Sequence, residues 1–348
     1  MKVVVIGATG NVGSSVVAAL TADPGVTSVL GVARRLPHWQ PEGTSWAIAD
    51  ITRDDLAPLL RGADVVIHLA WLFQPTHRPD LTWDNNVGGG LRVLSAVAEA
   101  QVPALVYASS VGAYSPGPKD RRVDESWPTD GWPTAGYTRE KAYLERALDA
   151  FEARQPGVRV ARLRPGFIFQ RQSASQQRRL FAGPLLPARL ARPELIPVVP
   201  GLPGLRFQAL HAEDVAQAFR LAALTGARGA FNLAAEPVVD PALLAGCLGA
   251  RVVPVPARVA RAGLALGWAL RLIPASPYLF DAVLRLPLMD TGRARAELGW
   301  SPRHSSQEAI SELLRGLRER SGADTPPLAS ELPDGRAAEL AGRLRARP

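Results

Sequence analysis

Cysteine is almost absent from this chain: Cys247 is the only one in 348 residues, which excludes an internal disulfide. Its apolar surroundings indicate a core residue. Lysine is nearly as rare, since only Lys2, Lys119 and Lys141 are lysines among 40 basic residues. The formal net charge of +8 therefore comes from arginines scattered along the chain. We interpret it as a compositional bias and expect no nucleic-acid partner.

Long apolar runs are missing too. The most apolar stretch, 259–289, is interrupted by arginines and prolines and falls short of the ~20 residues of a membrane span. It predicts helices of a substrate-binding lobe or a lid, with contact at a membrane surface as the alternative. The N-terminus lacks a charged lead-in followed by a cleavage site, so we expect a cytoplasmic protein.

Short apolar segments alternate with helix-length segments through the first half of the chain. This alternation predicts an α/β fold in which crossover helices join parallel strands. The expected strands are 2–6, 28–33, 45–49, 64–69, 104–108 and 158–163, and the expected helices are 11–22, 54–60, 81–101 and 137–154. Later segments predict strands at 206–210 and 230–233, and a helix at 306–320 that begins with a capping box, Ser305 and Glu308.

The first expected strand, 2–6, runs directly into a glycine-rich segment, GATGNVG, at 7–13. Gly7 allows a sharp turn, Gly10 lets a pyrophosphate approach the backbone, and Gly13 lets the following helix pack closely on the sheet. The free N–H groups of the first helical turn then face the phosphates. The segment predicts a dinucleotide site, with a turn that binds no ligand as the alternative.

Tyr137 is followed four residues later by Lys141, and Ser110 closes an apolar run upstream. With so few tyrosines and lysines, chance would give roughly 0.04 such Tyr-Lys spacings in the whole chain. Residues four apart share one face of a helix. An ammonium there lowers the pKa of a phenol, normally near about 10, and so helps it exchange a proton. The three residues predict an acid/base site, with an ordinary exposed helix pair as the alternative.

Together and in this order, these features resemble the extended branch of the short-chain dehydrogenase/reductase family. The resemblance covers roughly residues 1–318. Other matching segments are Asp50-Ile51, His68-Leu69-Ala70, Asn86-Val87-Gly88-Gly89, Arg164-Pro165-Gly166, His211 to Ala216 and Asp290 to Trp300. It implies a Rossmann-type doubly wound parallel sheet with a smaller C-terminal lobe. We place the nucleotide-binding domain at 1–165, an interleaved substrate-binding lobe at 166–320 and a mostly disordered tail at 321–348.

The resemblance also implies the site. Tyr137 would be the acid/base, Lys141 its electrostatic partner and a ribose contact, and Ser110 a donor to the substrate oxygen. The implied cofactor contacts are Gly7, Thr9, Gly10, Asn11, Val12, Gly13, Arg34, Arg35, Asp50, Ile51, Leu69, Ala70, Asn86, Lys141 and Pro165. Family members often form dimers through two long helices, which predicts a homodimer through 81–101 and 137–154.

The end of the second strand predicts which nicotinamide cofactor binds. NAD-preferring sites usually have a carboxylate where this chain has Ala33, and Arg34 and Arg35 follow it. Guanidinium groups suit a 2′-phosphate, so we expect NADP in preference to NAD. Asp50 is expected to contact the adenine, or alternatively only to start the next helix.

The substrate is predicted from aromatic segments near the expected nicotinamide, which favour a hydrophobic ketone or secondary alcohol. These are Trp71 to Phe73, Trp127, Trp132 and Phe167 to Phe169. Ser110-Val111-Gly112 stands where sugar-nucleotide dehydratases have Thr-Asp-Glu, which excludes dehydration. Two alternatives remain: a nucleotide-sugar epimerase with tightly bound NAD, and a non-catalytic NADP-binding redox sensor.

A metal site is not expected from the histidines. His211 and Asp214 lack a third ligand at suitable spacing, and their segment reads as a helix start. The other four histidines are dispersed along the chain.

Overall fold

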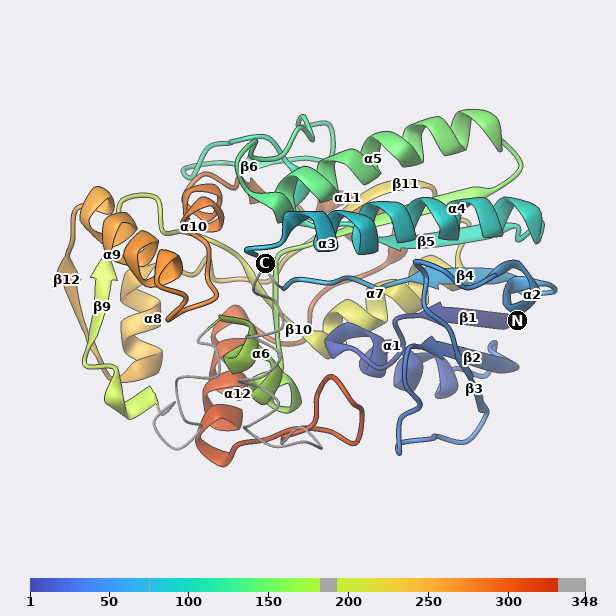
Figure 1. Ribbon diagram of the computed structural model, residues 1–348, viewed down its shortest axis with the longest axis horizontal. Coiled ribbons are helices and arrows are strands. Elements are labelled where there is room, and N and C mark those ends of the chain that lie inside the picture. Colours follow the sequence, from blue (N-terminus) through green and yellow to red (C-terminus); the bar gives the residue numbers. More distant parts are fainter. Residues whose placement is uncertain (75, 182–192, 331–348) are drawn as a thin grey trace.

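A parallel sheet of seven strands forms the centre of the part that the computed structural model describes, residues 1–74, 76–181 and 193–330 (Figure 1). The strand order is β11-β7-β5-β4-β1-β2-β3, so the chain winds outward in both directions from β1 and β4. This is the predicted doubly wound arrangement. The strands are β1 (Lys2–Ile6), β2 (Ser28–Ala33), β3 (Thr44–Ile48), β4 (Val65–His68), β5 (Ala104–Ala108), β7 (Arg159–Pro165) and β11 (Gly229–Leu233).

Helices cover both faces of this sheet (Figure 1). The first face carries α1 (Asn11–Thr21) and α7 (Ala212–Leu224), and the second carries α2 (Ala57–Leu60), α4 (Gly89–Glu99) and α5 (Gly136–Arg154). Each face has its own apolar cluster, so the central strands are buried on both sides. That double burial explains why they read as continuous apolar runs in the sequence.

The long helix expected at 81–101 is divided into three pieces. These are α3 (Pro79–Trp83), the π-helical turn η1 (Asp84–Gly88) and α4. Three glycines in succession, 88–90, favour the helix poorly, and Asn86 in the π-helical turn is buried. Such turns occur frequently at functional sites.

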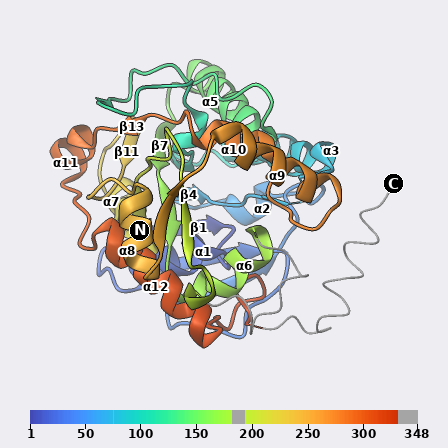
Figure 2. The ribbon, with the colours of Figure 1, turned by 90° about the vertical axis from the view of Figure 1, so that its left-hand side faces the viewer.

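The C-terminal lobe is interleaved with the sheet. The strand expected in the lobe at 230–233 is β11, which instead pairs with β7 in the central sheet. The lobe's other strands form pairs, β8 (Phe167–Phe169) with β10 (Ala209–His211), β9 (Val198–Gly201) with β12 (Arg251–Pro254), and β13 (Leu288–Met289) with β6 (Arg122–Val123). Its helices are α6 (Ala174–Phe181), α8 (Pro241–Leu248), α9 (Ala257–Ala269), α10 (Pro277–Val283), α11 (Gly292–Leu298) and α12 (Ser306–Glu319) (Figure 2).

The predicted capping box is present at the start of α12, where Ser305 and Glu308 bond to each other's backbone N–H. At the start of the expected tail, in 321–330, Thr325 and Leu328 are buried. Residues 331–348 lie outside the described residues. Among the described helices, none has the length and apolar character needed to cross a bilayer.

Candidate active site

Ser110 and Tyr137 meet at the carboxyl end of the central sheet. Ser110 lies just after β5 and caps the short turn η2 (Val111–Ala113) by accepting a bond from Gly112 N at 3.0 Å. Tyr137, in the first turn of α5, donates its hydroxyl to Ser110 Oγ at 2.9 Å. A Cβ at Gly112 would lie 2.6 Å from the Tyr137 ring. Gly112 is therefore needed for this contact, and the sequence analysis missed that role.

Lys141 lies one helical turn beyond Tyr137 and is buried. Its Nζ donates to the carbonyl oxygen of Ala108 at 2.7 Å and lies 3.5 Å from the ring centroid of Trp71. The structure thus brings together the three residues expected to be catalytic. Their catalytic roles remain a prediction.

The pKa values of the pair differ from the sequence expectation. Burial raises the pKa of Tyr137 to about 12, aided by the charge of Glu140 and opposed by the bond to Ser110. Burial also lowers the pKa of Lys141 to about 7, although Glu145 and Glu140 oppose this. Removal from water thus outweighs the stabilisation of the phenolate expected from Lys141. Tyr137 therefore keeps its proton at neutral pH, and its role as an acid remains a prediction.

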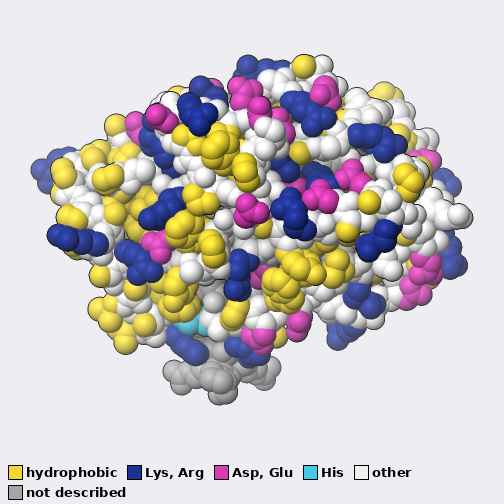
Figure 3. All heavy atoms as spheres, turned by 90° about the horizontal axis from the view of Figure 1, so that it is seen from above, with side chains coloured by type: hydrophobic (Ala, Val, Ile, Leu, Met, Phe, Trp, Pro, Cys, Tyr) yellow, Lys and Arg dark blue, Asp and Glu magenta, His cyan; other side chains and the backbone are white. Residues whose placement is uncertain are grey.

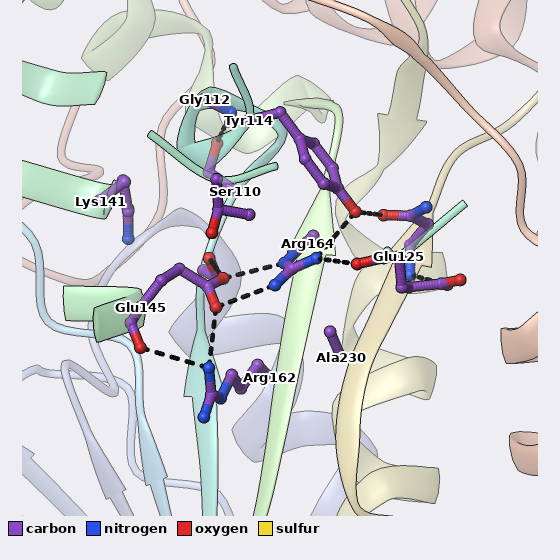
Figure 4. A network of polar contacts seen from close by, with 12 residues as sticks. Ser110, Gly112, Tyr114, Glu125, Lys141, Glu145, Arg162, Arg164 and Ala230 are labelled. Carbon is purple, nitrogen blue, oxygen red and sulfur yellow. Dashed lines mark hydrogen bonds and ion pairs between the residues drawn. The ribbon is translucent and has the colours of Figure 1, made fainter. Parts of the chain in front are cut away.

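A carboxylate network, shown in Figure 4, supports this site. Glu145 in α5 is fully buried and accepts bonds from Ser109 Oγ at 2.5 Å, from Arg164 at 2.9 Å and from Arg162 at 3.1 Å. Burial would raise the pKa of Glu145, but the bond and charge of Arg164 lead the opposing effects and lower it to about 2. Sequence reasoning missed Glu145, although its spacing of four residues from Lys141 was a signal.

The glycine turn fits the dinucleotide that was predicted. Gly7 has φ +86°, and a Cβ on it would lie 2.6 Å from Ala70 N; one on Gly13 would lie 2.2 Å from Gly7 O. Gly10 is different, because a Cβ there would come no nearer than 3.6 Å to the protein. Gly10 is also the N-cap residue of α1, so no side chain at that position caps the first N–H groups of the helix. Open space and uncapped N–H groups at a helix start suit a pyrophosphate.

Most other predicted cofactor residues also lie at the carboxyl ends of the strands. Thr9 and Val12 belong to the glycine turn and the first turn of α1, Leu69 and Ala70 follow β4, Ile51 follows Asp50, and Pro165 ends β7. Asn11 bonds to the lobe, donating to Ile168 O at 3.4 Å and accepting from Gln170 at 2.8 Å. The cofactor contacts of these residues remain predictions.

The residues expected to choose the cofactor follow β2 and β3. Arg34 and Arg35 come directly after Ala33, the last residue of β2, and both are exposed. Asp50 accepts bonds from Thr52 N and Oγ1 at 3.0 and 2.7 Å. Burial would raise the pKa of Asp50, but these bonds prevail and lower it. Asp50 starts a turn, whereas the next helix begins only at Ala57.

Asn86 holds a loop beside the site. It accepts from Leu72 N at 2.7 Å and donates to Leu72 O at 2.8 Å and to Glu140 Oε2 at 2.7 Å. Glu140 also accepts from Thr82 at 2.7 Å, and burial raises its pKa. The Asn86 side chain thus bonds to the protein itself, while its cofactor contact remains a prediction.

A cavity of about 210 Å³ opens beside Tyr137 and is lined mainly by apolar and aromatic side chains. Trp71 and Phe73 pack against the tyrosine, with ring centroids 5.6 and 5.1 Å from its own. Trp268 of α9 donates to Thr76 at 2.9 Å and stacks on His77 at 4.1 Å, both in the loop that follows Phe73. The stretch 259–289 therefore contributes a wall of this cavity. Figure 2 shows its helices α9 and α10 next to each other.

Three of the aromatic residues expected in the walls lie elsewhere. Trp127 and Phe167 belong to a separate apolar cluster with Val111 and Tyr114. The guanidinium carbon of Arg285 lies over Trp132, 4.7 Å from the centroid of the tryptophan ring. None of these three side chains lines the cavity, which the order of the sequence alone did not indicate.

The fold and this site define a Rossmann protein of the NAD-binding, short-chain dehydrogenase/reductase-like class. The chain belongs to the NAD dependent epimerase/dehydratase family, whose sequence model matches residues 3–234. The resemblance noted from the motifs is thereby confirmed. Enzymes that depend on NAD make up this family.

Relatives by sequence are distant. An uncharacterized protein of Mycobacterium tuberculosis is 26% identical over 324 residues, covering 90% of this chain and 83% of that protein. The L-arabinose 1-dehydrogenase (NAD(P)(+)) of Haloferax volcanii is 35% identical over 114 residues, which are 31% of this chain and 41% of that enzyme.

Solved structures show the same fold. UDP-glucose 4-epimerase of Thermus thermophilus, in complex with NAD, aligns with a TM-score of 0.67 at 22% identity over 91% of this chain and 99% of its own. UDP-glucose 4-epimerase of Thermotoga maritima, with UDP-glucose, aligns with a TM-score of 0.68 at 20% identity. The alignment covers 92% of this chain and 99% of that enzyme.

Proposed function

We propose that this protein is an NAD(P)-dependent oxidoreductase that interconverts a ketone and a secondary alcohol on a small hydrophobic body. The observation that carries the proposal is the placement of Tyr137, bonded to Ser110 and facing an apolar cavity. That cavity, at about 210 Å³, is smaller than the ~300–1,000 Å³ of typical drug-sized sites. A compact carbonyl compound suits it better than a nucleotide sugar.

In the direction of reduction, Tyr137 is the proposed acid. Because the pKa of Tyr137 is raised to about 12, the phenol keeps its proton until negative charge develops on the substrate oxygen. Ser110 Oγ lies 2.9 Å from the same phenol and is placed to donate to that oxygen. When bound, the nicotinamide supplies the hydride.

The test is Tyr137→Phe, with Tyr143→Phe as its matched control on the same helix. Tyr143 is 45% exposed and does not line the cavity. Removing the acid should lower turnover of a carbonyl panel at least ~100-fold, while NADPH binding measured by fluorescence stays the same. Retained turnover in Tyr137→Phe would refute the proposal.

A nucleotide-sugar epimerase is the second candidate, supported by the UDP-glucose 4-epimerases that share this fold. The two candidates differ in how the cofactor is held. Purified protein that carries stoichiometric NAD would favour epimerisation, and an empty site that titrates with NADPH would favour the reductase.

We infer a homodimer from the helices beside the site. Leu81, Trp83, Leu91 and Tyr143, on α3, α4 and α5, are all exposed, and Trp83 contacts Tyr143 with centroids 5.1 Å apart. Figure 3 shows apolar side chains among the charged ones on the side where α5 lies. Light scattering should give twice the chain mass of 37.2 kDa, and a mass of one chain would refute the dimer.

A further inference from the structure

A second, larger cleft of about 930 Å³ lies on the α1 and α7 side of the sheet. Helices α1, α7 and α12 and the segment 321–325 contribute its walls. It shares no lining residue with the cavity beside Tyr137. His211, Glu213 and His304 line it together, although residues 211 and 304 are far apart in the sequence.

We propose that these three residues bind a divalent transition metal, with zinc the best match. Their ligand atoms all lie within 4.8 Å of one another. His211 Nδ1 is 4.0 Å from Glu213 Oε2, and the His211 and His304 ring centroids are 4.2 Å apart. Two imidazoles and one carboxylate are a donor set that zinc prefers, and the open side of the cleft leaves room for a water or a ligand.

Asp214 prepares His304 for this role. The Asp214 carboxylate is buried and accepts from Arg303 N and His304 N at 2.9 Å each. It also lies 3.1 Å from His304 Nδ1. An ionised carboxylate only accepts, so this bond places the proton on Nδ1 and leaves Nε2 free to ligate a metal. A carboxylate behind a histidine is the usual support of a zinc ligand.

Small movements complete the coordination sphere. The Glu213 side chain is 68% exposed, so it can shift towards an ion while Asp214 holds His304 in place. His211 Nδ1 accepts a long bond of 3.3 Å from Glu213 N, which a metal at that nitrogen would replace.

Charge around the cleft is mixed. Arg303 lines it and opposes a cation, as do the N-terminal ends of α7 and α12. Carboxylates in the first turns of those helices, Glu213 and Asp214 in α7 and Glu308 in α12, offset this repulsion.

The sequence predicted no metal site at His211, because it offers no third ligand at a suitable spacing. The fold supplies His304 from the segment just before α12. A bound ion would join the start of α7 to the start of α12. Because it would bind only the folded chain, it would stabilise the fold.

The experiment uses the full chain without a histidine tag, stripped with a chelator and titrated with Zn²⁺ against a chromophoric competitor. Binding of one equivalent is expected, with a zinc-dependent rise in Tm. Co²⁺ in its place should give the intense visible absorption of a tetrahedral site. The variants are His304→Ala and Glu213→Gln, and His38→Ala, which removes an exposed histidine outside the cleft, is the control.

Zinc affinity should fall at least tenfold in both cleft variants and stay unchanged in His38→Ala. Glu213 is exposed, so Glu213→Gln tests the site even if His304→Ala folds poorly. Wild-type protein that shows no saturable binding, or variants that titrate like the wild type, would overturn the proposal.

Discussion

Glu145 accepts a hydrogen bond from Ser109 Oγ at 2.5 Å, and this contact aligns α5 with the end of β5. Tyr137, Lys141 and Glu145 follow one another at four-residue intervals along one face of α5. They bond to three consecutive residues, because Tyr137 reaches Ser110 and Lys141 reaches the carbonyl of residue 108. The acid/base geometry therefore depends on a helix register that the buried carboxylate helps to hold.

Glu145→Gln tests that dependence. Loss of the charge leaves the buried guanidinium of Arg164 without the carboxylate it pairs with, while Arg162 keeps Asp149 and Glu152. We therefore expect the unfolding free energy to fall by about 3–5 kcal/mol in urea denaturation. Glu152→Gln is the control, since Glu152 pairs with Arg162 but is 32% exposed, and it should cost about 1 kcal/mol or less. If both variants lost the same unfolding free energy, burial of the Glu145 ion pairs would not explain the cost.

The sequence predicted the central sheet well, because the patterns that indicate each strand lie within a few adjacent residues. Apolar runs bounded by glycine and proline predicted six of the seven central strands, β1 to β5 and β7. The spacing of Tyr137 and Lys141 placed both residues on one helix face. The capping box at Ser305 was likewise readable from four adjacent residues.

Contacts between distant segments were not readable in the same way. β11 joins the central sheet because β7 offers it an open edge, a fact of topology and not of local pattern. Trp268 reaches the cavity, and His304 reaches His211, through packing of the C-terminal lobe. The pKa of Lys141 depends on how deeply the side chain is buried, which spacing cannot indicate.

Arg34 should contribute to the choice of cofactor. Its guanidinium is exposed at the end of β2, where a 2′-phosphate would bind. We expect Arg34→Ala to raise the KM for NADPH about tenfold or more with little change for NADH, since a charge-assisted bond contributes ~1.5–3 kcal/mol. Arg53→Ala removes a nearby arginine that is 77% exposed, and should leave both constants unchanged. A parallel change for both cofactors would contradict a role in selection.

His68 should make the fold sensitive to acid. Burial, followed by the charge of Lys141, lowers the pKa of His68 to about 3. The ordinary pKa of a histidine is 6.5, so below this pH His68 binds a proton in the unfolded chain but not in the folded chain. The free energy of unfolding therefore falls as the pH drops from 6.5 towards 3. The slope from this one group approaches about 1.4 kcal/mol per pH unit.

His68→Phe keeps an aromatic ring in that buried position and removes the titration. Urea denaturation between pH 6.5 and 5, above the range of most carboxyl groups, should show a shallower loss of stability than in the wild type. His38→Ala removes an exposed histidine and should keep the wild-type slope. Identical slopes in His68→Phe and the wild type would mean that His68 titrates normally.

Lys141 should give the pH dependence of carbonyl reduction. With its pKa lowered to about 7, its ammonium is present below that pH and is lost as pH rises through it. Tyr137, with a pKa of about 12, stays protonated throughout. We expect kcat/KM to fall towards a slope of about tenfold per pH unit above pH 7. Lys119→Met is the control and should keep this decline, although burial lowers the pKa of Lys119 to about 8.

The titration can also be observed directly, because the chain has only three lysines. Protein labelled with ¹³C at the lysine ε-carbons should show one signal that titrates near pH 7 and disappears in Lys141→Met. If that signal titrated above pH 10, the ammonium would be charged across the working range. The decline in rate would then need another group, and the acid role of Tyr137 would rest on geometry alone.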